Sequence, residues 1–159
     1  MTISEANLPK PLAQLYSYWQ SKRGDRLMPS RADINPVEMQ AFLSHTMLID
    51  VLADQGDNPR FRLRLVGTHA VGAYGAEITG KYNDEIDLGD QREKVIAACL
   101  ESVYSKAPVF LSGSIVKQPE NETITYERLG VPLSSNGESV DMILVAVKLQ
   151  RKQCGSVPG

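Results

Sequence analysis

The chain has 159 residues and a net charge of -2, with 42% hydrophobic and 23% charged residues. This length suits one domain with a sizeable core and leaves no room for a second catalytic or DNA-binding domain. The small negative charge argues against nucleic-acid or acidic-membrane partners, because both need a concentrated basic surface. No secretory signal and no run of about 18 apolar residues is visible, so we expect a cytoplasmic protein.

The first half of the chain predicts a helix, a short helix and a hairpin. An amphipathic helix that ends at Gly24 is predicted from apolar residues at helical spacing, namely Leu12, Leu15, Tyr16 and Trp19. Asn35, as a cap in front of Pro36, predicts a short helix that runs to about Leu43. The segments "HTMLIDVLA" and "RFRLRLVG" are separated by the turn cluster "DQGDNP" and predict an antiparallel hairpin.

The second half predicts helices followed by three strands. Only short helical turns are expected over 68–88, interrupted by Gly72, Gly75 and Gly80. Asp90 is the predicted cap of a long helix whose apolar face holds Val95, Ile96, Cys99, Leu100, Val103 and Tyr104. Three strands follow, and Asn136-Gly137 predicts a hairpin turn between the last two.

The order of these elements predicts an α+β fold. The final strand is apolar on both faces, so it should lie in the centre of the sheet with both sides covered. The hairpin and the three later strands make a five-stranded antiparallel sheet, with the short helices and the long helix on one face. The N-terminal amphipathic helix is the natural cover for the other face.

The segment "YGAEITGKYND" (74–84) comes close to a phosphate-binding loop, with Gly75, four residues, Gly80 and Lys81. Such a loop needs Ser or Thr next, because that hydroxyl ligates magnesium, but Tyr82 stands there. The segment also follows a short helical pattern instead of a buried strand. We therefore do not expect nucleotide binding, and these glycines need another explanation.

Five motifs in one order give a specific resemblance. Trp19 is followed by "MPSRADINP" (28–36), "FRLRLVGT" (61–68), "YGAEITGKY" (74–82), "ERLGVPLS" (127–134) and "VDMILVAV" (140–147). Together they resemble a bacterial single-domain subgroup of PAS sensor domains, with its MPSRADIDP, RLVGT and LTG motifs. Asn35 replaces the usual Asp, and Gly130 replaces a bulky apolar residue, which predicts a bulge or a space beside the sheet.

The resemblance implies a division of the chain and a set of motif residues. It implies an N-terminal helical cap over 1–24, a PAS domain over 25–150 and a flexible tail over 151–159. It also implies motif or structural roles for Arg31, Asp33, Arg64, Gly67, Gly75 and Gly80. For Arg31 and Asp33 the interpretation we favour is a salt bridge between them that fixes the crossover to the sheet, and the alternative is ligand contact.

Cofactors that occur in PAS domains are tested against the residues. Heme sensors of this fold usually supply a histidine from the long helix, and 90–106 contains none, so heme is disfavoured. Flavin photosensors need a reactive cysteine motif that is absent, so flavin is disfavoured and Cys99 is interpreted as a small buried hydrophobe. No metal-site spacing exists, and Cys154 forms no disulfide framework with Cys99.

Two charged patterns concern surfaces. Arg60, Arg62 and Arg64 share one strand face, which we interpret as a solvated or salt-bridged outer face, with anion binding as the alternative. Tyr126 and Arg128 also share a strand face, and they are candidates for a dimer or partner surface alongside the arginines.

The sequence-based hypothesis is a stand-alone sensory or regulatory PAS domain, not an enzyme, that signals through contact with another protein. A homodimer is expected through the N-terminal helix, with Leu12, Leu15, Tyr16 and Trp19 as its apolar surface. A small, mostly apolar ligand is expected between the sheet and the long helix, near His69, Tyr74, Cys99, Val103, Leu129 and Ile143. The alternatives are an adaptor without a ligand, or a small isomerase or hydrolase that uses His69.

Overall fold

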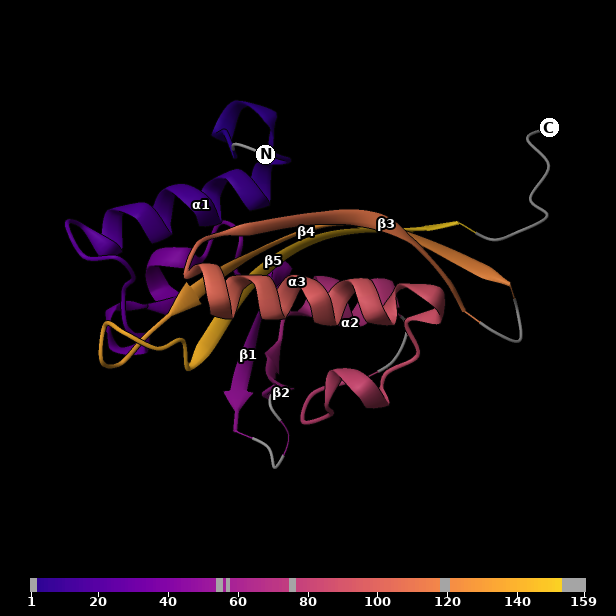
Figure 1. Ribbon diagram of the computed structural model, residues 1–159. Helices are drawn as coiled ribbons and strands as arrows, with labels where there is room; N and C mark the ends of the chain where they lie inside the picture. Colours follow the sequence, from indigo (N-terminus) through magenta and orange to yellow (C-terminus); the bar gives the residue numbers. More distant parts are fainter. Residues whose placement is uncertain (1–2, 54–55, 57, 75–76, 118–120, 153–159) are drawn as a thin grey trace.

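One antiparallel sheet organises the molecule. A computed structural model describes residues 3–53, 56, 58–74, 77–117 and 121–152 (Figure 1). The five strands follow the order β2-β1-β5-β4-β3. They are β1 (Thr46–Leu52), β2 (Arg60–Val66), β3 (Val109–Lys117), β4 (Glu122–Leu133) and β5 (Met142–Lys152). The predicted α+β fold and the central position of the last strand are both confirmed.

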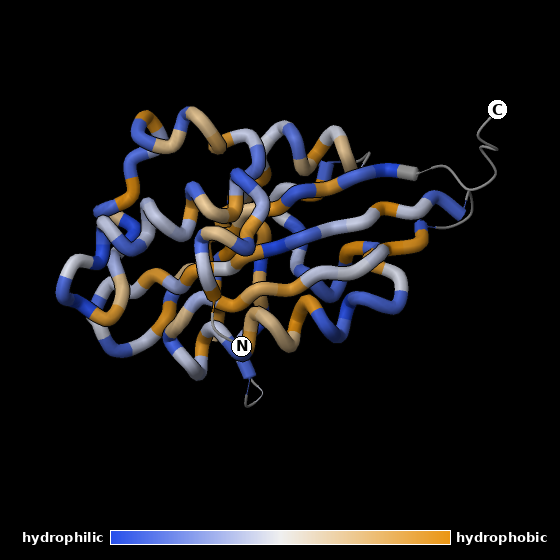
Figure 2. Tube along the Cα trace, turned by 90° about the horizontal axis from the view of Figure 1, so that it is seen from above, coloured by the Kyte–Doolittle hydropathy of each residue, from blue (hydrophilic) through white to orange (hydrophobic). Residues whose placement is uncertain are grey.

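Helices cover both faces of this sheet. The helix α1 (Lys10–Arg23) packs on β4 and β5, while α2 (Thr68–Tyr74) and α3 (Arg92–Ser105) lie on the opposite face (Figure 1). The connecting 3-10 turns are η1 (Glu5–Asn7), η2 (Arg31–Asp33), η3 (Pro36–Met39), η4 (Leu43–His45), η5 (Asn83–Glu85) and η6 (Gly89–Gln91). Hydrophobic and hydrophilic residues are interspersed along the chain in Figure 2. No helix in the described ranges is both long and apolar enough to cross a bilayer.

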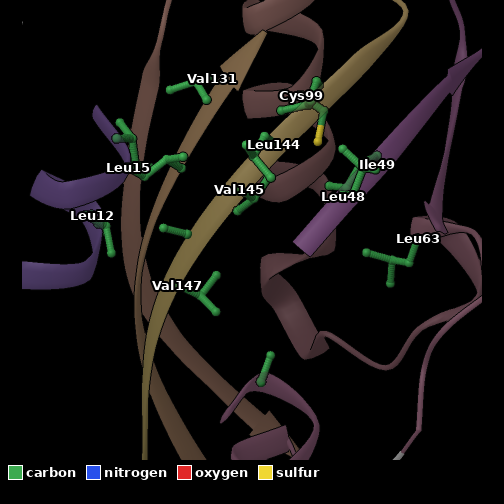
Figure 3. Close-up of a cluster of buried hydrophobic side chains, with 14 of the residues drawn as sticks. Leu12, Leu15, Leu48, Ile49, Leu63, Cys99, Val131, Leu144, Val145 and Val147 are labelled. Atoms are coloured by element: carbon green, nitrogen blue, oxygen red, sulfur yellow. The ribbon is translucent and has the colours of Figure 1, made fainter. Parts of the chain in front are cut away.

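The apolar stripe of α1 is buried within this chain. Leu12 and Leu15 are fully buried and lie beside Val131 of β4 (Figure 3). The indole Nε1 of Trp19 donates to the Pro132 carbonyl at 2.8 Å, which satisfies the polar atom of a buried ring. Tyr16 is half-buried. The structure therefore gives Leu12, Leu15 and Trp19 a role in the chain's own core and not on an exposed partner surface.

The helix predicted to begin at Asn35 is shorter than expected. Asn35 does act as a cap, since its Oδ1 accepts from Val37 N at 3.0 Å, but the helical turn η3 ends at Met39. Met39 and Phe42 are both buried and stand three residues apart. A turn beyond η3, in which Phe42 N donates to the Met39 carbonyl at 2.9 Å, brings both side chains into the core.

Three details around α2 and α3 also differ from the sequence-based expectations. Gly72 does not interrupt α2, which runs through it to Tyr74. Asp90 lies inside η6 and does not cap α3, which begins at Arg92. Tyr104 is 63% exposed, because it stands five residues after Cys99, roughly 140° around the helix from that buried position.

The glycines near the sheet edge have backbone roles. Gly80 has a φ of 88°, and its N–H donates to the Leu63 carbonyl at 2.6 Å, while Leu63 N donates to the Lys81 carbonyl at 2.9 Å. The segment that came close to a phosphate loop thus continues the pairing at the edge of β2. A Cβ on Gly67 would lie 2.3 Å from the Ser44 carbonyl oxygen, so only glycine fits there. Gly75 lies outside the described residues, as do Cys154 and most of the predicted tail.

Candidate functional site

A cavity of about 80 Å³ lies between the sheet and the α2/α3 layer. Its apolar wall comes from β1, β2, β3 and β5 and from the helical layer, through Met47, Ile49, Leu63, Ala70, Ile78, Ile86, Leu88, Val95, Ile115, Val147 and Leu149. One water needs roughly 10–15 Å³ measured this way, whereas drug-sized ligands need pockets of roughly 300–1,000 Å³. The cavity as it stands therefore suits a small ligand.

Two tyrosines place hydroxyl groups at the cavity wall. The Tyr74 hydroxyl donates to the Asp87 carbonyl, and burial together with the charge of Asp87 raises the pKa of Tyr74 to about 12. The Tyr126 hydroxyl donates to Gln91 Oε1 at 2.8 Å, and burial raises the pKa of Tyr126 as well. Both phenols are therefore neutral at physiological pH, and both are held in place by a hydrogen-bond acceptor.

Arg128 is the one charged residue among the described residues that line the cavity. It is 3% exposed, and its Nη2 donates to the Cys99 sulfur at 3.1 Å. Its Nη1 is buried and has no hydrogen-bond partner among the described residues. Asn83 Nδ2 also approaches the Cys99 sulfur, at 3.7 Å. Burial raises the pKa of the Cys99 thiol, so the sulfur carries no charge to balance the guanidinium.

Gly130 makes room for this guanidinium. A Cβ there would lie 3.4 Å from Arg128 Nη1 and 3.2 Å from Ile143 Cγ2. The pairing of β4 with β5 is continuous from Thr123↔Lys152 to Leu133↔Met142. The predicted bulge is therefore absent from this ladder, and the space beside Gly130 is occupied by Arg128 and Ile143.

The position of Arg128 corrects the idea that it and Tyr126 form a partner surface. Both are buried, and they face away from the side of the sheet that carries Arg62 and Arg64. The sequence did hold a signal, because Ile124, Tyr126 and Arg128 alternate in phase along one strand. When a charged residue alternates in step with buried residues along a strand, and the sheet is covered on both faces, its side chain points into the core.

The residues predicted for the pocket are only partly brought together. Tyr74 lines the cavity, whereas Cys99 and Ile143 are buried on the same side without lining it. Val103 is half-buried on α3. Leu129 lies on the opposite face of β4, because its neighbour Arg128 faces the cavity. Cys99 is seen across β4 and β5 from Leu12 and Leu15 in Figure 3.

His69 lies on α2 beside the cavity without lining it and forms a pair with His45. Their ring centroids are 3.9 Å apart. His69 Nε2 accepts from Leu149 N at 3.2 Å, and His45 Nδ1 lies 3.2 Å from the Val147 carbonyl. Burial lowers the pKa of His69, and repulsion from His45 lowers it further. The two rings therefore extend the hydrogen bonding of β5 past the end of β1.

The arginine stripe of β2 is salt-bridged, in line with the interpretation favoured above. Asp50 is 3% exposed and accepts from Arg64 Nε at 2.8 Å and from Arg62 Nη2 at 3.0 Å. Arg60 pairs with Asp84 at 2.9 Å. The buried carboxylate of Asp50 thus has two cationic partners, in contrast to Arg128.

The expected salt bridge between Arg31 and Asp33 is wrong. The Asp33 carboxylate accepts from Ser30 N at 2.8 Å and pairs with Arg26 Nη2 at 3.0 Å. Arg31 Nη1 instead donates to the Ile34 carbonyl at 3.2 Å. Side chains at the ends of a single 3-10 turn diverge, so Asp33 folds back to cap its own turn.

A second hollow, of about 200 Å³, lies on the opposite face of the sheet. Leu48 forms part of its floor, and the half-exposed side chains of Leu43 and Leu65 stand at it. Successive residues of β1 alternate between the two hollows, since Met47 and Ile49 line the cavity. No three potential metal ligands converge within the part of the chain that the structure describes.

Comparison with known proteins adds three findings. A family model described as "PAS domain" matches residues 8–147. A solved structure of the PAS domain of an HTR-like protein from Haloarcula marismortui is similar, with a TM-score of 0.44 and 18% sequence identity, over 72% of this chain and 93% of that one. No curated protein matches this chain.

Proposed function

The chain belongs to the PAS domain family, and from this premise we propose that it is a sensory domain that binds a small ligand in the cavity and signals through contact with another protein. The observation that carries the proposal is the cavity itself. It is lined by every strand of the sheet and by the helical layer, and one buried charge stands in its wall. Ligand sites are usually mostly apolar cavities into which a small number of polar groups converge.

The strand β1 supplies a physical route from this cavity to the surface. Its odd-numbered residues Met47 and Ile49 line the cavity, and the intervening Leu48 lines the hollow on the other face. A ligand that displaces β1 slightly moves the side chains on both of its faces together, because a packed strand moves as a unit. The exposed apolar side chains of Leu43 and Leu65 support the choice of that second face as the partner surface in this proposal.

Native mass spectrometry of the purified protein against its denatured mass tests this function. We expect a reproducible extra mass that is lost on denaturation, and the same spectrum reports the oligomeric state. Ala70→Leu should reduce the occupancy, because Ala70 is buried in the cavity wall and the larger side chain fills the space. Ala97→Leu is the matched control, since the same change falls on an exposed position of α3.

A bare protein in the spectrum, together with no small molecule that raises its thermal midpoint, would contradict ligand sensing. That pair of results would favour the adaptor without a ligand. The enzyme alternative would need His69 to act from beside the cavity, because His69 does not line it and its Nε2 accepts from Leu149 N.

A further inference from the structure

The buried guanidinium of Arg128 is the feature of the cavity that the fold leaves unbalanced. Arginine keeps its proton in proteins, so it cannot avoid burial by becoming neutral as a lysine or a histidine does. A buried charge needs an opposite charge or a full set of hydrogen bonds, and without them it destabilises the fold. At 3% exposure, Arg128 falls under this rule.

The chain offers this cation very little. Its Nη2 donates to the Cys99 sulfur, which is a weak acceptor, and Nη1 has no acceptor among the described residues. No ion pair joins Arg128 to any described carboxylate. The Tyr126 hydroxyl donates to Gln91 Oε1, and the unpaired Nη1 reaches neither of these oxygens. The guanidinium thus has a nitrogen without an acceptor among the described residues, and Arg128 is one of the residues that line the cavity.

The position of the guanidinium is built into the strand. Gly130 lets the guanidinium lie close to the backbone of β4, since a Cβ there would lie 3.4 Å from Nη1. The rest of the wall is apolar apart from the anchored hydroxyls of Tyr74 and Tyr126 and the amide of Asn83. The cavity thus has one cationic point and a larger hydrophobic remainder.

The geometry points to a small monocarboxylate with an apolar body as the ligand of this cavity, its carboxylate on the Arg128 guanidinium and its apolar part against the sheet and α2. This inference rests on the proposed function and names the ligand class. A carboxylate matches the two-pronged geometry of a guanidinium and forms hydrogen bonds about twice as strong as neutral ones. The volume of about 80 Å³ restricts the apolar part to a short chain or a single small ring.

The experiment measures thermal midpoints of the full chain with straight-chain carboxylates from acetate to octanoate, each beside its uncharged primary amide and beside sodium chloride at equal ionic strength. At a ligand concentration of about 100 times Kd, a bound carboxylate should raise the midpoint by roughly 5–10 °C. The amide and chloride should give much smaller shifts. Calorimetric titration of the best carboxylate then gives its Kd.

Two variants assign the effect to Arg128. Arg128→Met keeps the length of the side chain and removes the charge, so the carboxylate shift should vanish while the ligand-free midpoint stays the same or rises. Arg128→Lys keeps the charge but loses the fork, so the Kd should weaken by at least about tenfold. Arg64→Met is the matched control, because it removes an exposed arginine from the other face and should leave the carboxylate shift unchanged.

Several outcomes would overturn the inference. Equal shifts from carboxylate and amide, equal shifts from carboxylate and chloride, or a carboxylate shift that survives in Arg128→Met would each exclude this ligand class. A ligand-free Arg128→Met protein that unfolds at a much lower temperature, without any carboxylate effect in the wild type, would make Arg128 a structural residue. A neutral molecule found by native mass spectrometry would remove the carboxylate assignment and leave the sensory function standing.

Discussion

The two faces of the sheet bury their residues in different ways. Over β4 and β5, the side chains of Leu12 and Leu15 are fully buried under α1, and the hollow on this face lies beside β1 and β2. On that same face the buried carboxylate of Asp50 is matched by two arginines. Across the sheet, the α2/α3 layer leaves a cavity, and the buried cation Arg128 has no anion among the described residues.

This difference separates stability from binding within one small domain. Full packing and matched charges stabilise a fold, while a space with an unmatched charge costs stability and is retained where a ligand supplies the missing contacts. The α1 face therefore holds the domain together, and in the proposed function the α2/α3 face is where a ligand would change its free energy. Substitutions on the two faces should then differ in sign as well as in size.

The largest effect is expected for Leu15→Ala on the α1 face. It removes a fully buried side chain from the packed core and should lower the free energy of unfolding by about 2–5 kcal/mol. Leu27→Ala is the control, because Leu27 is 54% exposed and its truncation should change that free energy by less than about 0.5 kcal/mol. Urea denaturation measures both. A loss for Leu15→Ala as small as that of the control would mean that residues 1–24 are a detachable cap.

A smaller loss is expected for Asp50→Asn. The substitution removes the charge that binds Arg62 and Arg64, both of which are partly exposed and can be rehydrated, so unfolding should become easier by about 1–2 kcal/mol. Asp84→Asn, which breaks an exposed pair with Arg60, should cost less than about 1 kcal/mol. Denaturation curves at low and high salt check the order. Equal losses for the two variants would contradict the claim that Asp50 is a matched buried charge.

The smallest effect concerns pH and the histidine pair beside the cavity. Because the pKa of His69 is lowered in the folded state, the neutral ring is favoured by folding. The stability that the neutral His69 ring contributes to the fold should be fully present above the ordinary histidine pKa of about 6.5. It should be lost as pH falls through the lower pKa of His69 in the folded state. His69→Gln retains an acceptor for Leu149 N and should flatten this dependence, as measured by urea denaturation between about pH 5 and pH 8.

His45 provides the control for that titration. Its proximity is part of the reason that the pKa of His69 is lowered, so His45→Asn should move the NMR titration midpoint of His69 upward. A midpoint that stays in place or moves downward would show that burial alone sets the His69 pKa. Identical pH dependence in wild type and His69→Gln would remove the pair from any pH-linked stability.

Much of the fold was predictable, because the spacing of apolar residues within a short stretch of sequence indicates a helix or a strand. The double-sided apolar pattern of the last strand correctly placed β5 in the centre of the sheet. The candidate site was less predictable. Tyr74 was correctly picked from helix phase, but Leu129 was assigned to the wrong side of β4, since a one-residue error in phase exchanges the two faces. Arg128 was taken for a surface residue because charged side chains are rarely buried.

The sequence by itself determined the family, the order of the elements and the alternation along each strand, because these depend on neighbours within a few residues. Only the tertiary structure decided which face of β4 meets α3, and therefore that Arg128 is buried beside Cys99 with Nη1 unpaired among the described residues. It also decided that the α1 stripe packs on this chain's own sheet. Both outcomes depend on contacts between segments far apart in the sequence, 29 residues for Arg128 with Cys99 and 113 for Trp19 with Pro132, and no local pattern encodes them.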